Sequence, residues 1–107
     1  MKPKKFTKKP VEIEAMQNTR AQYMDVYQWI ERNTLGSFDM TEYEGDGAPE
    51  HPASGVSIDP TDGRMVISTL EGMHWVDLGD WVIRGVAGEF YPVKPEIFAE
   101  TYEEVSE

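Results

Sequence analysis

The sequence predicts an α+β fold in which one N-terminal helix packs on a strongly bent antiparallel sheet, or on a small partly open barrel, of five to seven strands. Two observations predict it: a helical repeat of apolar residues covers about residues 20–33, and short strand-like runs separated by Gly, Pro and Asp turns follow. A chain of 107 residues buries roughly 60–65% of its unfolded surface, which suffices for one domain without crosslinks. The absence of cysteine excludes disulfides, thiolate catalysis and cysteine-ligated metals.

Charge is segregated along the chain. Residues 1–10 hold five lysines and no acidic residue, which leaves five basic and all 20 acidic side chains to the rest, a net charge of −15. We predict a flexible basic arm over residues 1–9 and a single α+β domain over residues 10–107. The arm is interpreted as a solubilising tail, with electrostatic attachment to nucleic acid or to an acidic partner as the alternative.

The acidic body argues against direct DNA binding, because phosphate neutralisation requires clustered Lys and Arg. Its charge is interpreted as a source of solubility; the alternatives are a surface that imitates the phosphates of DNA or one that docks on a basic protein. No segment approaches the roughly 20 apolar residues of a membrane span, and the N-terminus lacks the apolar stretch of a signal peptide. We therefore expect a soluble protein without membrane association.

The first strand is predicted over residues 11–16. Val11, Ile13 and Ala15 alternate there with polar neighbours, which is the period-2 pattern of a strand with one buried and one exposed face. The apolar set is expected to face the core.

A helix is predicted from about Arg20 to Asn33. Thr19 and Gln22 have the spacing of a capping box, in which each side chain bonds the free backbone N–H of the other. Gly36 is placed to end the helix in a left-handed C-cap. The apolar face of the helix consists of Tyr23, Val26, Tyr27 and Ile30, with Trp29 at its edge.

Residues 36–57 lose periodicity and are rich in Gly, Pro, Ser and acidic residues, which predicts a long mobile acidic loop. Four of its residues have the spacing of positions 1, 3, 5 and 6 of a calcium-binding loop. They are Glu42, Glu44, Asp46 and Gly47. Position 12 needs a bidentate carboxylate but is Ala53, so no calcium site is predicted.

The C-terminal half is predicted to contain several short strands, of which three or four in succession form an antiparallel meander. Strands are predicted at residues 56–59, 64–69, 73–78, 81–84 and 89–93. The turn signals between them are Pro60–Gly63, Leu70–Gly72, Gly79-Asp80 and Gly85–Gly88. A short helix from about Lys94 to Ala99, with proline in its first turn, and an edge strand from Thr101 to Val105 complete the chain.

No catalytic constellation is recognised. The five serines lie outside a Gly-x-Ser-x-Gly elbow, and only His51 and His74 could act as a base, neither of them near a nucleophile in sequence. The glycines at 79, 85 and 88 link strands to strands, whereas a phosphate-binding loop links a strand to a helix. We predict a non-enzymatic protein without catalytic residues, bound metal or cofactor.

An aromatic and cationic platform is the best candidate for binding. Its residues are Trp75, Trp81, Arg84, Tyr91 and Lys94. The four-residue connection at 85–88 predicts that Arg84 faces Glu89, and in the same register Val82 faces Tyr91. Arg84 and Tyr91 would then share a face suited to stacking and anion contact. The alternative is that the aromatics fill the core and that Arg84 and Glu89 form a cross-strand ion pair.

Segments at both ends of the chain carry a resemblance. They are Gly79–Gly85, Gly88–Pro92, Lys94-Pro95, Ile97-Phe98 and Thr101–Glu103, together with Lys8–Ala15 and Thr69–Gly72. This set resembles a group of small, mostly uncharacterised proteins encoded by bacteriophages and prophages, which typically carry a Pro-Gly-Asp-Tyr/Trp turn where this chain has Leu78 in place of the proline. The resemblance implies a phage source and expression in the host bacterial cytoplasm, but no established activity.

From small size, acidity, missing catalytic groups and this resemblance, we expect a phage accessory protein that binds and neutralises a host component by protein–protein interaction. One alternative is an anti-defence protein that sequesters a nucleotide-type signal at an oligomer interface, and another is a minor virion component. The expected partner is a host protein or a small anionic ligand, and a homo-oligomer is among the expected states.

Overall fold

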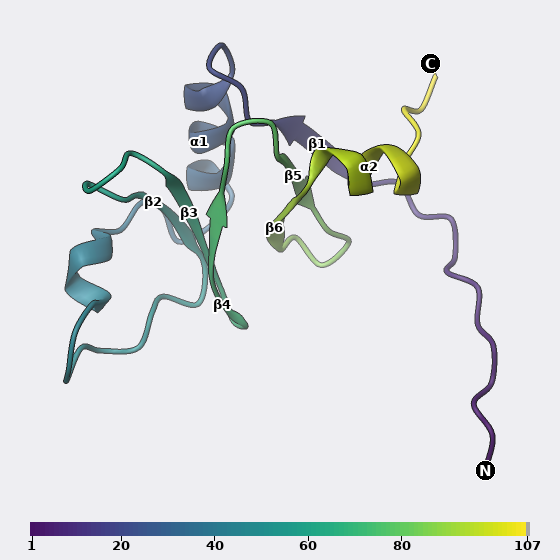
Figure 1. The fold of residues 1–107 in the computed structure, drawn as a ribbon, viewed down its shortest axis with the longest axis horizontal. Helices are drawn as coiled ribbons and strands as arrows, with labels where there is room; N and C mark the ends of the chain where they lie inside the picture. Colours follow the sequence, from purple (N-terminus) through teal and green to yellow (C-terminus); the bar gives the residue numbers. More distant parts are fainter. Residues whose placement is uncertain (107) are drawn as a thin grey trace.

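In the computed structural model, which describes residues 1–106, two three-stranded antiparallel sheets and one helix meet around a single core (Figure 1). The first sheet has the order β1-β5-β6 and consists of β1 (Glu14–Gln17), β5 (Trp81–Arg84) and β6 (Phe90–Val93). The second has the order β2-β3-β4 and consists of β2 (Gly55–Ile58), β3 (Met65–Thr69) and β4 (Gly72–Val76). The helices are α1 (Tyr23–Arg32), the 3-10 helix η1 (Met40–Tyr43) and α2 (Pro95–Thr101).

The α+β class is confirmed, but the described strands form two sheets rather than one bent sheet or a barrel. Strands β2, β3 and β4 are consecutive antiparallel neighbours, as the meander predicts. The chain then crosses to the other sheet, because β5 pairs with β1 and β6 and not with β4. The reason lies in the turn at residues 77–80, where the Gly79 N–H donates to the Asn18 carbonyl (2.7 Å) and the Asn18 N–H donates to the Asp80 carbonyl (2.8 Å).

Helix α1 packs against both sheets, and its predicted apolar face is confirmed. Val26 and Ile30 are fully buried. Trp29 meets the ring of Phe90 edge-on, with 5.0 Å between the centroids, and so joins the helix to the first sheet. The other buried members of the core come from both sheets: Val56, Met65, Ile67, Val76 and Val82.

The ends of α1 differ from the predicted ones. The helix begins at Tyr23, because residues 20–22 first form a turn. In that turn the Gln22 N–H donates to the Thr19 hydroxyl at 3.2 Å, which is one half of the predicted capping box. Asn33 is the C-cap, with φ −112°. Gly36 has a left-handed φ of +101° but lies beyond that cap, so its predicted capping role is wrong.

The first strand begins later than predicted, and its apolar set lies on the face of the sheet away from the main core. Val11 is 53% exposed, and pairing with β5 begins at Glu14. Met16 packs against the core, whereas Ala15 pairs with Ile83 on the opposite face of the sheet. The alternation of apolar residues therefore indicated a strand but not which residues face inward. The position of β1 is set by its partner β5, which the turn at residues 77–80 places.

The segment from residue 36 to residue 57 contains local structure. Met40, the first residue of η1, is buried, and Phe38 packs edge-on against Tyr43 with 5.7 Å between the ring centroids. A parallel bridge between residues 37 and 56 joins the segment to β2, which begins at Gly55. One helical turn and a short strand thus occupy a stretch for which the sequence predicts a loop.

The predicted hairpins of the second sheet are confirmed. Between β2 and β3, the Gly63 N–H donates to the Asp59 carbonyl at 2.8 Å, and Gly63 has a left-handed φ of +75°. Between β3 and β4, Thr69 pairs with Gly72, so residues 70 and 71 form a two-residue turn. Both reversals lie where Gly and Pro indicate them in the sequence.

The C-terminal helix α2 is confirmed, with proline in its first turn, but the edge strand predicted for residues 101–105 is wrong. The Tyr102 N–H donates to the Phe98 carbonyl at 3.0 Å, and the two rings stack with centroids 5.1 Å apart. The chain after α2 therefore packs back on the helix and joins no ladder up to residue 106. Within the described residues, no helix is both long and apolar enough to cross a membrane. Residue 107, which belongs to the predicted domain, lies outside the described residues.

Gly55→Ala should destabilise the fold by about 2–4 kcal/mol. Gly55 has a φ of +140°, and a Cβ atom there would lie 2.7 Å from the Gly36 carbonyl oxygen. The matched control is Gly72→Ala, because Gly72 has a φ of +134° but open space around it. The control should cost only the backbone strain, about 1–2 kcal/mol. Urea unfolding measures both, and equal losses would contradict the close approach of residues 36 and 55.

Candidate functional site

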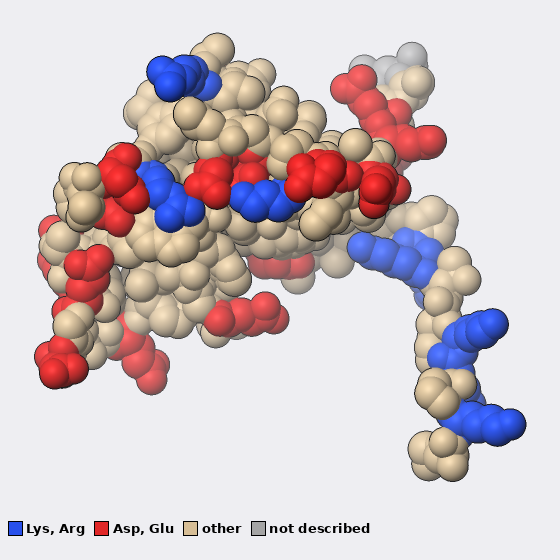
Figure 2. Space-filling view, viewed as in Figure 1, with Lys and Arg blue, Asp and Glu red and all other residues tan. Residues whose placement is uncertain are grey.

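Four charged side chains meet at the turn between β4 and β5. We call them the Asp77 cluster: Arg64, Asp77, Asp80 and Lys94. The Arg64 guanidinium donates to Asp77 Oδ1 from Nη2 (2.7 Å) and from Nε (3.0 Å). Lys94 Nζ donates to Asp77 Oδ2 at 2.9 Å and to the two carboxylate oxygens of Asp80 at 3.1 and 3.2 Å. Figure 2 shows basic and acidic side chains alternating in a row across this face.

Asp80 is the buried member of the Asp77 cluster, with a side chain only 4% exposed. Asp80 also accepts a hydrogen bond from the Asp77 N–H at 2.9 Å, so it stabilises the turn in addition to binding Lys94. Hydrogen bonds from Lys94 and Arg64 lower the pKa of Asp77. Hydrogen bonds to the carboxylates of Asp77 and Asp80 raise the pKa of Lys94. Lys94, a predicted site residue, is thus engaged within the protein and not free for an anionic ligand.

Trp75 lies next to this cluster. Its side chain is on the face of β4 opposite to Val76, which is in the core, and it is 37% exposed. The Arg64 guanidinium lies over its ring, 4.7 Å from the centroid. Trp75 and Lys94 are therefore brought together through Arg64 and Asp77, in a network that neutralises its own charges.

Arg84 and Tyr91 lie on opposite faces of the first sheet, contrary to the predicted register. Arg84 pairs with Phe90, and Tyr91 pairs with Ile83. The hairpin is closed by the Gly85 N–H, which donates to the carbonyl of residue 89 at 2.7 Å and leaves a three-residue loop. Gly88 ends that loop with a left-handed φ of +85°, the usual geometry of such hairpins. A shift of one residue moves a side chain to the other face, so the shared platform is wrong.

The proposed pair between Arg84 and Glu89 is not formed either. Arg84 lies over the Phe90 ring, 5.7 Å from its centroid, and its Nη1 is 3.8 Å from a carboxylate oxygen of Glu14. The carboxylate of Glu89 lies instead against Gly85, where a Cβ atom would collide with it. Arg84 is thus a half-buried side chain that packs on an aromatic ring of the core.

Trp81 and Tyr91 hold α2 on the first sheet. The Trp81 ring stacks on Phe98, with 4.1 Å between centroids and 7° between planes. Burial, and then a hydrogen bond with Tyr102, raise the pKa of Tyr91 to about 12. Both aromatic side chains therefore pack toward α2, outside the core that the alternative assigns to them, and the five predicted residues do not converge on one site.

A cleft of about 730 Å³ opens where the ends of the two sheets diverge, and we call it the inter-sheet cleft. It is bounded by the end of α1, the β3–β4 turn and the β5–β6 loop. Its lining includes Asn33, Thr34, Ala53, Ser54, Ser68, Thr69, Leu70, Glu71, His74, Ala87, Gly88, Glu89, Phe90 and Tyr91. Tyr91 is the one predicted site residue in this lining. Because the walls come from distant segments, no single sequence motif marks the cleft.

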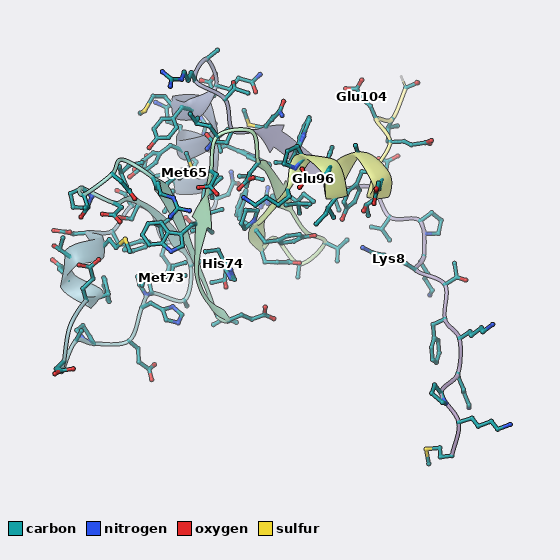
Figure 3. All side chains as sticks on the ribbon, in the orientation of Figure 1. Lys8, Met65, Met73, His74, Glu96 and Glu104 are labelled. Carbon is teal, nitrogen blue, oxygen red and sulfur yellow. The ribbon has the colours of Figure 1, made fainter. Side chains whose placement is uncertain are left out.

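The chemistry of the cleft is apolar at its base and acidic at its walls. Phe90 is buried, whereas Leu70 at the tip of the β3–β4 turn is 85% exposed. Glu71 and Glu89 are the acidic residues of the lining, with the Glu89 carboxylate lying against Gly85, and no described lining residue is Lys or Arg. Figure 3 shows His74 on the side of β4 that faces β6, and its Nε2 lies 3.3 Å from the hydroxyl of Thr69. Such a lining suits a cation or a hydrogen-bond donor better than an anion.

His51 and Ser68 lie close together but are not arranged as a base and a nucleophile. Ser68 Oγ donates to the Pro52 carbonyl at 2.5 Å. His51 Nδ1 lies 3.0 Å from that carbonyl and 3.1 Å from Ser68 Oγ, which favours a protonated Nδ1 that donates to both. The serine proton therefore points away from the imidazole, and the contact holds the segment before β2 on β3. Within residues 1–106, no group of three His, Asp or Glu side chains could hold a metal ion.

Comparison of the chain with protein-family models, curated proteins and solved structures gave no significant match. The resemblance to phage-encoded proteins therefore stays a prediction.

Asp77→Asn should make the fold less sensitive to acid. The pKa of Asp77 is lowered in the folded state, so its carboxylate stabilises the fold above the unfolded value of 3.8. That contribution is lost as the pH falls through the lower folded-state pKa. Below about pH 4 the free energy of unfolding should thus fall more steeply in the wild type than in the variant.

Urea unfolding at a series of pH values from about 2 to 7 measures these slopes. The control is Asp46→Asn, because Asp46 is an exposed carboxylate in the segment before β2, and this variant should keep the wild-type slope. An Asp77→Asn slope equal to that of the wild type would show that the ion pairs add nothing to stability.

Proposed function

We propose that the protein is a non-enzymatic binding protein that captures a basic segment of a partner protein in the inter-sheet cleft. The observation that supports the proposal is the charge of the lining, in which Glu71 and Glu89 are present and no described residue is Lys or Arg. A guanidinium or ammonium group in the cleft would be attracted by Glu71, and by Glu89 once its carboxylate turns away from Gly85.

The distribution of charge outside the cleft supports the same class of partner. Arg64 and Lys94 are paired with Asp77 and Asp80, and Arg84 lies near Glu14. Three of the five cations of the acidic body are thus paired with carboxylates, while Arg20 and Arg32 form no ion pair among the described residues. Because the body holds all 20 acidic side chains, the field around it is negative. Such a field speeds the approach of a basic partner and disfavours an acidic one.

Leu70 supports a protein partner rather than a free cation. It is 85% exposed at the tip of a two-residue turn, next to Glu71 and on the rim of the cleft. An exposed apolar side chain on the rim of a pocket offers a partner protein apolar surface to bury. The segment that fits best therefore combines apolar and basic side chains.

On the strength of the sequence resemblance, we place the partner among the proteins of a bacterial host and infer that its capture neutralises it. The site of action would then be the host cytoplasm. Sequestration of a nucleotide in the cleft is less well supported, because phosphate recognition requires Lys or Arg and the described lining contains neither.

A blocked Arg-Leu-Arg peptide should bind the cleft and shift the backbone amide signals of Glu71, Glu89 and Tyr91 in NMR spectra of the full-length, ¹⁵N-labelled protein. The double variant Glu71→Lys/Glu89→Lys should bind at least about tenfold more weakly, because like charges then face the peptide. Leu70→Ala should weaken binding by about tenfold through loss of its apolar contact.

The control is Glu96→Lys/Glu100→Lys, which changes the net charge equally on the exposed side of α2. It should retain nearly wild-type binding. Equal weakening in both double variants would show unspecific attraction and contradict a site in the cleft. A cyclic dinucleotide that binds where the basic peptide does not would favour the nucleotide alternative.

A further inference from the structure

We propose that the basic arm, residues 1–9, binds a second copy of the chain in a groove beside α2. This α2 groove has a volume of about 620 Å³. It is lined by Pro10, Val11, Glu12, Ile13, Ala15, Trp81, Phe98, Tyr102, Glu103, Glu104 and Val105. It shares no lining residue with the inter-sheet cleft, so the proposal is independent of the proposed function.

The α2 groove combines an aromatic wall with an acidic rim. The stacked rings of Trp81, Phe98 and Tyr102 form the wall. Three carboxylates lie along the groove, at residues 12, 103 and 104. Val11 and Val105 are 53% and 59% exposed at its edges, so apolar surface is open to solvent. An aromatic or aliphatic side chain flanked by cations would match both features.

The arm has the complementary composition. All residues from 1 to 10 are exposed, and five of them are lysines. Among these lysines lies Phe6, whose side chain is 88% exposed. Lys8 shows the kind of contact that is expected, since its Nζ lies over the Tyr102 ring, 5.8 Å from the centroid. A solubilising tail accounts for the lysines but not for an exposed phenylalanine in their midst.

Lys8 contacts the groove of its own copy, but the direction of the chain before it favours a second copy for the rest of the arm. Pro10 is itself part of the groove wall, and Lys9, as the residue before a proline, favours an extended backbone. The arm accordingly runs away from the body (Figure 1) and carries its lysines apart from the acidic residues (Figure 2). Nine extended residues reach roughly 30 Å, enough to cross to a facing groove. Around a two-fold axis the two copies would exchange arms, and each contact would be made twice.

The first test is the oligomeric state of the full-length chain. Sedimentation velocity at about 0.15 M salt should show a dimer that dissociates near 1 M salt, where short-range charge pairs are screened. Phe6→Asp should raise the dimer dissociation constant by about tenfold or more, and it cannot unfold the body because Phe6 packs on nothing there. Met24→Asp, which places the same charge at an exposed position of α1, should leave the dimer unchanged.

A charge exchange tests whether the arm acts between copies. Lys8→Glu/Lys9→Glu and Glu103→Lys/Glu104→Lys should each weaken self-association, because like charges then meet in the groove. An equimolar mixture should form a heterodimer, since both of its arm–groove contacts join opposite charges. A quadruple variant with all four changes on one chain should also dimerise.

Several results would overturn the proposal. One is a monomeric wild type at about 100 μM, roughly a hundredfold above a micromolar dissociation constant. A dimer that ignores Phe6→Asp, or a mixture that stays monomeric, would do the same. Loss of the dimer in Glu71→Lys/Glu89→Lys would place the arm in the inter-sheet cleft instead. Because that variant is expected to dimerise normally, failure of this proposal and failure of the proposed function can be told apart.

Discussion

The arrangement of the two sheets depends on the way Asn18 holds the turn between β4 and β5. Asn18 is 1% exposed, and its N–H, its carbonyl and its side-chain Nδ2 all bond to residues 77–80. Its Oδ1 is buried and accepts no hydrogen bond from a described residue. Asn18 thus directs three hydrogen bonds to one turn. Because β1 ends, β4 ends and β5 begins at this point, the same contacts decide that the chain leaves one sheet and enters the other.

This dependence explains which parts of the fold were predictable. The buried face of α1 with Val26 and Ile30, and the β2–β3 hairpin closed at Gly63, follow from patterns within about ten residues of each other. The pairing of β5 with β1 instead rests on bonds between Asn18 and Gly79, which are far apart in sequence. Local turn signals indicate that the chain reverses but not which strand it then pairs with. The sequence pattern alone therefore favours a continuous meander.

Prediction of the candidate site is limited in the same way, here by a shift of one residue in the strand register. Gly85 and Gly88 correctly indicated a hairpin, but the αL geometry of Gly88 makes a three-residue loop rather than a four-residue one. That difference separates Arg84 from Tyr91, so that Arg84 lies over the Phe90 ring and Tyr91 hydrogen-bonds with Tyr102. Lys94 and Trp75 were likewise recognisable as polar and aromatic residues near a turn, whereas their use within the Asp77 cluster depends on Arg64 from another hairpin. The inter-sheet cleft was not predictable at all, because its walls meet only in the folded chain.

The pairing of charges also shapes how copies of the chain would meet. The whole protein carries a net charge of −10, so two copies repel each other at long range. Contacts between an arm and an acidic groove act over a few ångström, well within the roughly 8 Å screening length at physiological ionic strength. Moderate salt thus screens the repulsion between bodies before it weakens the contact pairs. Association through the arms would therefore be strongest at intermediate ionic strength and weaker at lower and at higher ionic strength. Simple attraction between oppositely charged molecules does not produce this dependence.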